Sequence, residues 1–304
     1  MKVGDKDFIP LDVPPETREI FRGNYRKITH GRGRLMLFAG DQKVEHMNDD
    51  FYGQGIDQDD ADPEHLFRIA AKGRIGVFAT QLGLIARYGE DYGEVPYLVK
   101  LNSKTNLRKT SEQDPHSAGL YTVDDVVRFR EHSGLSIRAV GYTVYPGSEY
   151  EAEMLAEAAR TVIQAHRHGL VTVLWMYPRG RSIRDETDPH LVAGAAGIAA
   201  ALGSDFVKVN VPEKDGVHVP GLLKEASQAA GRTKVICSGG PSIDEAQFLQ
   251  GLYDQIHLGG TSGNATGRNI HQKSLEEAIR MCNAIAAISL DDLGPKEALQ
   301  FLDK

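Results

Sequence analysis

A lysine interrupts the apolar run FVKVNV at residues 206–211, in a pattern with chemical consequences. Successive side chains of a β-strand point to opposite faces, so the three valines share one face while Lys208 and Asn210 share the other. A lysine removed from water holds its proton less tightly, and its free amine can attack a carbonyl to form a Schiff base. The alternative is a structural ion pair, and the position of Lys208 alone leaves both interpretations open.

Two further strand-like runs end on groups that could move protons. In the run TVLWMY, Trp175 and Tyr177 fall on one face, and Asp41 directly follows the run LMLFAG. Taken singly, Tyr177 is explained by core packing with a bonded hydroxyl, and Asp41 by a cap on the next element. Together with Lys208 at strand ends, they favour an amine nucleophile with two proton-transfer groups, lined by the apolar Trp175.

Two glycine-rich segments have the composition of phosphate-binding loops. The first is SGGP at 238–241, and the second is GNATGRN at 263–269, which contains Gly267 and Arg268. Glycines let backbone N–H groups close on an anion, and an arginine can donate two parallel hydrogen bonds to a phosphate. Tight turns with positive φ would also explain the glycines, but two such segments in succession favour a phosphorylated ligand.

These side chains need a scaffold that gathers strand ends. Short runs rich in β-branched residues predict eight strands, at 35–40, 75–80, 97–102, 139–145, 172–177, 206–211, 234–238 and 255–260. Helical patterns lie between them, at 63–72, 123–132, 149–168, 188–202, 220–230, 243–252 and 274–288. This alternation favours an α/β fold with one (β/α)₈ TIM barrel; a doubly wound sheet is the alternative.

The barrel interpretation also predicts how the chain is divided. Residues 1–33 would form an amino-terminal extension, 34–290 the barrel and 291–304 a short tail. Active sites of this fold lie at the carboxyl ends of the strands, where the three candidate catalytic side chains fall. The polar segment 42–62 would then lie on the catalytic face.

Composition limits the class of partner. The chain has 304 residues, 41% of them hydrophobic, and its 35 Lys and Arg against 42 Asp and Glu give a net charge of −7. This composition is typical of a globular protein and gives no support to nucleic acid as the principal partner. The sequence has no apolar stretch of about 18 residues and only two cysteines, so we expect a cytoplasmic protein without membrane partners.

Motifs for cofactors and metals are absent from the sequence. The segment 259–267 lacks both the Walker lysine and the dinucleotide glycine spacing. The eleven histidines show no spacing typical of metal ligands. We therefore expect neither an organic cofactor nor a metal.

Several segments resemble the archaeal-type class I fructose-bisphosphate aldolases, a family that also contains aldolase-like synthases. The similarity runs from about Leu35 to the helix after Gln272, and its segments are VKLNSKT (99–105), AVGYTVYPGS (139–148), WMYPRG (175–180), GSDFVK (203–208), SGGP (238–241) and GRNIHQ (267–272). The resemblance implies that Lys208 is the Schiff-base lysine, Tyr177 the general acid/base and Asp41 the carboxylate after the first strand. It also implies a homo-oligomer.

The same resemblance implies the substrate-binding residues. The glycines after the seventh and eighth strands fall on the family's phosphate sites. Trp175 is expected as an apolar wall, and Arg179, Arg268 and Lys43 as cations of the barrel mouth. The expected substrate-binding residues are therefore Trp175, Arg179, Ser238, Gly239, Gly240, Gly267, Arg268 and Lys43.

The chain departs from the family pattern at two places. The family has Asp-His-Gly where this chain has Asp41-Gln42-Lys43, and many members have a lysine where this chain has Asn210. The first change places an extra cation, Lys43, at the expected mouth, and the second removes a cation from the barrel interior. Both bear on substrate identity more than on the chemistry of Lys208.

These features favour a metal-independent class I aldolase that acts on a sugar phosphate. The resemblance implies fructose 1,6-bisphosphate, formed from dihydroxyacetone phosphate and glyceraldehyde 3-phosphate, in glycolysis and gluconeogenesis. One alternative is a related synthase, similar to 2-amino-3,7-dideoxy-D-threo-hept-6-ulosonate synthase, or another sugar-phosphate aldolase. A noncatalytic sugar-phosphate-binding barrel is the other, and iminium trapping would separate it from the enzymes.

Overall fold

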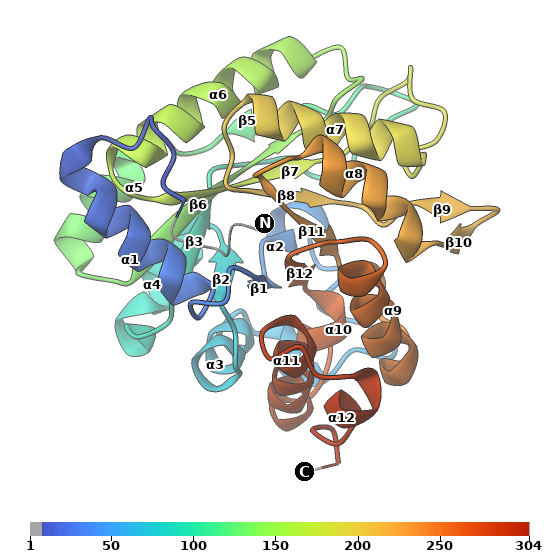
Figure 1. Ribbon diagram of the computed structural model, residues 1–304. Helices are drawn as coiled ribbons and strands as arrows, with labels where there is room; N and C mark the ends of the chain where they lie inside the picture. Colours follow the sequence, from blue (N-terminus) through green and yellow to red (C-terminus); the bar gives the residue numbers. More distant parts are fainter. Residues whose placement is uncertain (1–7, 304) are drawn as a thin grey trace, which may run out of the picture.

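The computed structural model describes residues 8–303. Eight parallel strands close into a barrel, in the order β1-β12-β11-β8-β7-β6-β3-β2 around the ring (Figure 1). They are β1 (Leu35–Ala39), β2 (Val77–Thr80), β3 (Tyr97–Lys100), β6 (Ile137–Val144), β7 (Val171–Met176), β8 (Phe206–Val209), β11 (Lys234–Ser238) and β12 (Gly263–Thr266). The predicted (β/α)₈ TIM barrel is confirmed.

Helices surround the barrel and connect its strands. The longer ones are α1 (Arg18–Ile28), α3 (Glu64–Lys72), α4 (Leu82–Tyr88), α5 (Val123–Ser133), α6 (Glu151–Arg167), α7 (Pro189–Ala201), α8 (Leu223–Ala229), α9 (Glu245–His257) and α11 (Leu275–Ser289). Shorter helices are α2 (Gln42–Glu45), α10 (Arg268–His271), α12 (Pro295–Leu299), and the 3₁₀ turns η1 (Pro15–Thr17), η2 (Gln58–Ala61), η3 (Gly89–Tyr92) and η4 (Pro220–Leu222). Two small hairpins pair β4 (Asn102–Ser103) with β5 (Ala118–Gly119), and β9 (Glu213–Lys214) with β10 (Val217–His218).

Side chains of the strands alternate between the barrel interior and the helical layer. On β8, Phe206 belongs to the inner apolar cluster, whereas Val207 and Val209 belong to the outer one, between strands and helices. On β7, Trp175 is an inner residue and Met176 an outer one. This parity is the one predicted from the sequence, and it directs alternate side chains of β8 and β7 toward a common interior.

Helix α1 packs at the amino ends of the strands. Its Phe21, Tyr25 and Ile28 cluster with Leu35 and Phe206, which begin β1 and β8. The rings of Tyr25 and Phe206 stack with their centroids 5.7 Å apart. Apolar groups therefore fill the amino-terminal end of the barrel, which leaves the carboxyl end for polar chemistry.

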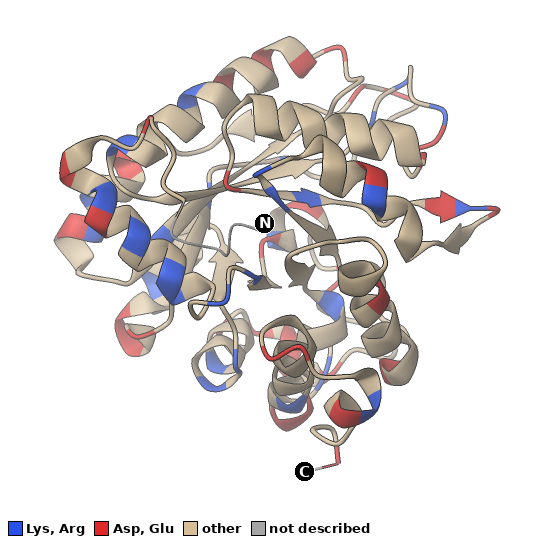
Figure 2. Ribbon diagram, viewed as in Figure 1, with Lys and Arg blue, Asp and Glu red and all other residues tan. Residues whose placement is uncertain are grey.

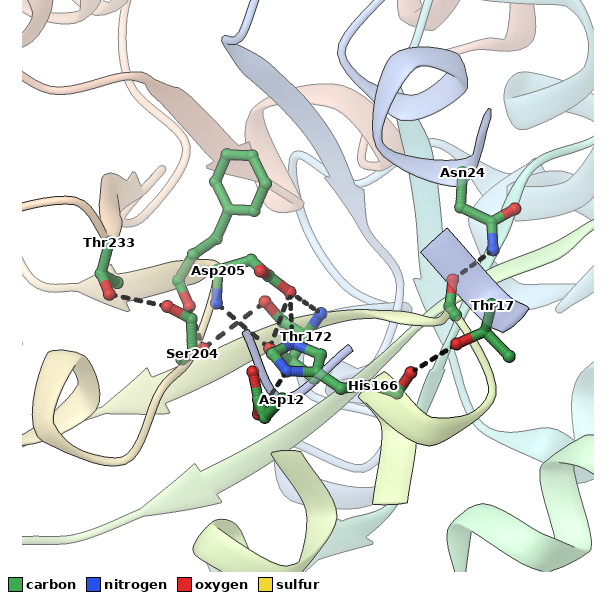
Figure 3. A network of polar contacts seen from close by, with 10 residues as sticks. Asp12, Thr17, Asn24, His166, Thr172, Ser204, Asp205 and Thr233 are labelled. Atoms are coloured by element: carbon green, nitrogen blue, oxygen red, sulfur yellow. Dashed lines mark hydrogen bonds and ion pairs between the residues drawn. The ribbon is translucent and has the colours of Figure 1, made fainter. Parts of the chain in front are cut away.

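A buried histidine connects the segment that precedes α1 to the barrel (Figure 3). His166 of α6 has no exposed surface, and its Nδ1 and Nε2 lie 2.7 Å from Asp12 Oδ2 and 3.2 Å from Asp205 Oδ2. The same oxygen of Asp205 accepts hydrogen bonds from Thr172 N and Oγ1. Burial favours the neutral ring, but the Asp205 and Asp12 carboxylates outweigh it and raise the pKa of His166 to about 9. The protonated imidazole thus bridges two carboxylates from distant segments.

The eighth strand differs from its predicted position. The prediction at 255–260 was wrong, because Gln255 still belongs to α9 and the strand is β12, four residues with the polar sequence GNAT. Its polar side chains are satisfied inside the protein: Asn264 Nδ2 donates to Thr266 Oγ1 at 2.6 Å, and Ser289 Oγ donates to Asn264 Oδ1 at 2.9 Å. The expected loop 263–269 therefore begins only at Gly267.

The remaining sequence expectations concern the division of the chain and its surface. The boundaries after residues 33 and 290 stay predictions, and residues 1–7 and 304 lie outside the described part. Charged residues of both signs are intermixed over the outer helices and loops (Figure 2). Within residues 8–303, no helix is long and apolar enough to cross a membrane.

Candidate active site at the carboxyl ends of the strands

Lys208 lies inside the barrel toward the carboxyl end of β8. Its side chain is 6% exposed, and its neighbours across the sheet are Trp175 on β7 and Ile236 on β11. Nζ lies 5.4 Å from the centre of the Trp175 ring. Burial lowers the pKa of Lys208, against the opposing effect of the Asp41 and Glu45 carboxylates. The barrel therefore favours the free amine that Schiff-base formation requires.

A second buried lysine lies beside it, which the sequence reasoning missed as a site residue. Lys100 ends β3, is 3% exposed, and its Nζ lies 5.3 Å from the centre of the Trp175 ring. Nζ donates hydrogen bonds to the backbone oxygen of Asn102 at 2.8 Å and to its Oδ1 at 3.1 Å. Burial lowers its pKa to about 8; Asp41 and Glu45 oppose this change and the Lys208 cation adds to it. Strand alternation in YLVK (97–100) could have identified Lys100, because it shares a face with Leu98, which points into the barrel.

The Trp175 ring depends on a glycine of the neighbouring strand. Trp175 is almost fully buried, and a Cβ on Gly141 of β6 would overlap its ring. Only glycine leaves the space that the indole fills beside the two lysines. The Nε1–H of Trp175 is buried and has no hydrogen-bond partner in the described chain. It is thus a free donor inside the site.

Tyr177 and Asp41 lie at the same end of the barrel. Tyr177 follows β7, and its backbone N–H donates to Val144 O at 3.1 Å, which anchors it beside β6. Burial raises the pKa of Tyr177, and the negative charges of Asp41 and Glu45 raise it further. Asp41 precedes α2 without capping it, so its carboxylate is not used by the helix. The charge of Asp41 raises the pKa of both Lys208 and Tyr177, so the three candidate catalytic side chains influence one another. Tyr177 supplies a protonated phenol, and Asp41 an available carboxylate.

Arg179 lies at the mouth next to these groups. Its guanidinium is 6.0 Å from the Tyr177 ring and 5.5 Å from the Tyr145 ring. Arg179 Nε donates to Glu186 Oε1 and Oε2 at 2.9 and 2.8 Å, and Nη1 lies 3.8 Å from Glu45 Oε1. Burial disfavours the charged guanidinium, but Glu186 and its neighbours more than offset this and raise the pKa of Arg179. Arg179 is therefore a fixed cation at the mouth.

The two glycine-containing loops are joined to each other. Asn269 Nδ2 donates to Gly239 O and to Pro241 O, each at 2.9 Å, so the start of α10 is fixed to the loop after β11. Ser238 Oγ donates to Asn210 Oδ1 at 3.0 Å. Gly240 has φ +66°, a conformation that favours glycine. The expected residues Ser238, Gly239 and Gly240 thus lie at one mouth, next to the loop that carries Gly267.

Gly267 and Arg268 complete this side of the mouth. A Cβ on Gly267 would overlap the side-chain amide of Gln42, so this residue of α2 packs directly on the loop after β12. Arg268 Nη1 lies 3.7 Å from Asp50 Oδ1. The guanidinium therefore has a carboxylate neighbour in the polar segment 42–62.

Lys43 is placed apart from these residues. Its Nζ lies over the Phe51 ring, 4.0 Å from the ring centre. Burial lowers the pKa of Lys43, against the carboxylates of Asp60 and Asp62. The structure thus places Lys43 against Phe51, Asp60 and Asp62 of the segment 42–62, which are not the neighbours of Lys208. Its expected phosphate contact stays a prediction.

Metal ligands are not assembled in the described chain. Among residues 8–303, no group of three or more His, Cys, Asp or Glu side chains is arranged to hold a metal ion. The chemistry to be explained is that of two buried amines, a protonated phenol, a carboxylate and an indole N–H.

Comparisons with known proteins find similar barrels. A family model described as "DeoC/LacD family aldolase" matches residues 35–273. A fructose-bisphosphate aldolase from Slackia heliotrinireducens is similar in structure, with a TM-score of 0.95, 54% identity, and coverage of 98% of this chain and 94% of that one. An archaeal fructose-1,6-bisphosphate aldolase, solved with its catalytic Lys covalently bound to the carbinolamine intermediate, matches with a TM-score of 0.76 and 34% identity, over 89% of this chain and 99% of that one.

Curated relatives cover most of the chain. It is 58% identical over 292 residues to the fructose-bisphosphate aldolase/6-deoxy-5-ketofructose 1-phosphate synthase of Methanocaldococcus jannaschii, across 96% of this chain and 93% of that protein. It is 34% identical to the class 1 fructose-bisphosphate aldolase of Thermoproteus tenax, across 87% of this chain and 92% of that protein. With the family model matching from the first barrel strand to the helix after the last, this chain belongs to the DeoC/LacD family of aldolases.

Proposed function

We propose that this protein is a class I aldolase that cleaves fructose 1,6-bisphosphate to dihydroxyacetone phosphate and glyceraldehyde 3-phosphate, and catalyses the reverse condensation. The observation that carries the proposal is the Lys208 amine, buried against Trp175 with its pKa lowered by that burial. An ordinary lysine, with a pKa near 10.4, would be only about 0.1% deprotonated near pH 7.4. Burial is therefore what makes Lys208 a nucleophile.

The first half of the reaction forms an iminium. The nitrogen of Lys208 bonds to the ketose C2 as the C=O π bond breaks, and the proton that the nitrogen loses is balanced by the one that the oxygen gains, which gives a carbinolamine. Tyr177, whose raised pKa keeps its phenol protonated, donates the proton with which that hydroxyl leaves as water. The resulting C=N⁺ bond withdraws electrons from C3.

The second half breaks and restores bonds to C3. A base removes the proton of the C4 hydroxyl, the C3–C4 bond breaks, and its electron pair passes into the iminium to give an enamine and free aldehyde. We assign this transfer to Tyr177, as phenolate after the first step, and to Asp41, whose charge acts on both Tyr177 and Lys208. Protonation of the enamine at C3 and addition of water to the iminium release dihydroxyacetone phosphate and restore the amine. Each positioned acid or base contributes roughly 10²–10⁴ in rate.

We assign the substrate's ketose-side phosphate to the loops after β11 and β12. Backbone N–H groups at Gly240 and Gly267 and the guanidinium of Arg268 suit an anion, whereas the N–H of Gly239 already donates to Ala265 O. The fixed join between these loops through Asn269 supports this assignment, because it holds them in place before ligand binds.

Borohydride reduction in the presence of dihydroxyacetone phosphate tests the proposal. We expect a stable adduct on Lys208, located by peptide mass mapping, and none in Lys208→Met. EDTA should leave cleavage of fructose 1,6-bisphosphate unchanged. An adduct on another lysine, or activity that survives Lys208→Met, would contradict the assignment.

A second product is supported by one relative. The Methanocaldococcus jannaschii protein is also named 6-deoxy-5-ketofructose 1-phosphate synthase. Breaking C3–C4 of that product gives dihydroxyacetone phosphate and 2-oxopropanal, so the same Lys208 enamine would attack an unphosphorylated aldehyde. Assaying both aldehydes with one enzyme preparation separates the two reactions.

We also propose that the enzyme works in the cytoplasm as a homo-oligomer, in glycolysis and gluconeogenesis. Cys237 and Cys282 are buried, unpaired thiols, as in proteins of reducing compartments. Light scattering after size-exclusion chromatography tests the assembly, for which a mass of one 33.3 kDa chain would be the contrary result.

A further inference from the structure

A cavity lies at the amino-terminal end of the barrel, away from the candidate active site. Its volume is about 420 Å³, and its walls come from α1, from the residues between η3 and β3, and from the α5–β6 connection. Its polar side chains are Asn24, Lys27, Glu94, Arg130, Ser136 and Arg138. Catalysis in this fold takes place at the opposite ends of the strands, so the mechanism uses none of them.

Arg138 is held at this cavity by uncharged partners. Its Nε donates to Ser136 Oγ at 2.9 Å, and its Nη1 donates to Asn24 Oδ1 at 3.0 Å. Asn24 is 2% exposed, and its Nδ2 donates to Gly169 O at 2.7 Å, a bond that Figure 3 shows. The orientation of the guanidinium is thus fixed before any ligand binds.

Arg130 adds a second, partly buried guanidinium. Its only printed hydrogen bond is a long one, from Nη1 to the backbone oxygen of His168 at 3.5 Å. Burial lowers the pKa of Arg130, the Glu131 carboxylate opposes this change, and the Arg138 cation adds to it. Within residues 8–303, neither arginine forms an ion pair with a carboxylate. Two partly buried cations that repel each other are unfavourable, and an anion between them would relieve the repulsion.

The rim of the cavity carries one charge of each sign. Lys27 of α1 and Glu94 before β3 both line it, and both are exposed. Exposed charges are screened by solvent and salt more strongly than partly buried ones. The single carboxylate of Glu94 therefore does not cancel the two guanidiniums deeper in the cavity.

We propose that Arg130 and Arg138, with Lys27 at the rim, bind the phosphate group of a small phosphomonoester at the amino-terminal end of the barrel. Two guanidiniums suit a dianion, because each can donate parallel hydrogen bonds to its oxygens. A cavity of this volume also has room for the organic part of the ester. The ligand would join α1, α5 and β6, and it would not compete with a substrate at the other end of the barrel. The site does not depend on the aldolase function.

Protection from phenylglyoxal, which modifies guanidinium groups, tests the site residue by residue. Inorganic phosphate is the probe, and peptide mass mapping measures the rates at Arg130 and Arg138 in the wild-type protein. Modification needs the free site, so both rates should fall about tenfold at a phosphate concentration about ten times Kd. Arg128 on the same helix is 73% exposed and pairs with Asp125, so its rate should not change. Sodium chloride at the same ionic strength should protect neither arginine of the site.

Arg130→Gln tests whether the two guanidiniums act together. The phosphate concentration that half-protects Arg138 should rise about tenfold or more, since charge-assisted hydrogen bonds are lost. Because Arg130 has no counter-ion among the described residues, the phosphate-free variant should unfold at the wild-type temperature or above, which separates lost binding from misfolding. Arg128→Gln is the matched control and should leave protection of Arg138 unchanged. Absence of protection in the wild type, equal protection by chloride, or protection of Arg138 that survives Arg130→Gln unchanged would each overturn the site.

Discussion

The side-chain amines of Lys100 and Lys208 face the same Trp175 ring, with Nζ atoms 5.3 and 5.4 Å from its centre. The charge of Lys208 lowers the pKa of Lys100, so the protonation of the two amines is coupled. Asn102 offers two oxygens to Lys100, which stabilises its charged form. Burial lowers the pKa of both lysines, and a charge on either one lowers the pKa of the other.

Replacing Lys100 should make Lys208 a weaker nucleophile at neutral pH. Lys100→Met removes a cation, so the pKa of Lys208 rises and borohydride trapping of dihydroxyacetone phosphate needs a higher pH. The measurement is the trapping rate against pH, read at Lys208 by mass mapping. Lys100→Arg keeps the charge and should stay closer to wild type. If the pH at which trapping reaches half its maximal rate is the same in Lys100→Met and the wild type, the role of Lys100 is merely structural.

Tyr177→Phe should separate binding from proton transfer. The substitution removes one hydroxyl and keeps the ring, so fructose 1,6-bisphosphate should still bind while kcat falls by about 10²–10⁴. Single-turnover cleavage, with binding followed by calorimetry on the same preparation, measures both effects. A kcat near that of wild type would mean that another group supplies the proton.

Gly141→Ala should disturb the site through packing alone. The new methyl would overlap the Trp175 ring, which must move from its place beside the two lysines. Overpacking of this kind costs about 1–3 kcal/mol in the free energy of unfolding, and kcat should fall with it. Trp175 is the only tryptophan in the chain, so its fluorescence reports the displacement directly. Gly194→Ala, on α7 where a Cβ meets no atom within 4 Å, is the control. An unshifted emission spectrum in Gly141→Ala would contradict this account.

Strand alternation explains which site residues could be found from the sequence. It placed Lys208 and Trp175 on inner faces correctly, because a buried parallel strand has a strict period of two, whereas Tyr177 follows the end of β7. The same rule applied to YLVK would have identified Lys100. Alternation carries no information on loops, so the position of Lys43 over Phe51, which depends on contacts within the segment 42–62, could not be predicted.

The last strand was missed for a different physical reason. Strand β12 has none of the branched apolar residues that mark buried strands, since its outward Asn264 and Thr266 are satisfied by one another and by Ser289. That compensation comes from α11, which is distant in sequence, so no local pattern could reveal it.

The buried His166 gives a prediction about stability. Its pKa of about 9 in the folded protein exceeds the ordinary 6.5, so the folded state holds a proton that the unfolded state releases. The stabilisation is complete below pH 6.5 and is lost as pH rises through about 9. The pKa difference corresponds to about 3 kcal/mol in the free energy of unfolding.

The difference in the free energy of unfolding between His166→Gln and the wild type should therefore become smaller as pH rises. At pH 6 the variant leaves the buried Asp205 without its cation and should be much less stable in urea unfolding. At pH 9.5 the wild-type imidazole is itself mostly neutral, so the gap between the two proteins should shrink. His190→Gln is the control, because that exposed histidine pairs with Glu225 at the surface, where ion pairs contribute little. A gap for His166→Gln that stays constant from pH 6 to 9.5 would mean that the imidazole stabilises the fold by packing, since only an ionised ring bridging Asp12 and Asp205 gives a contribution that titrates.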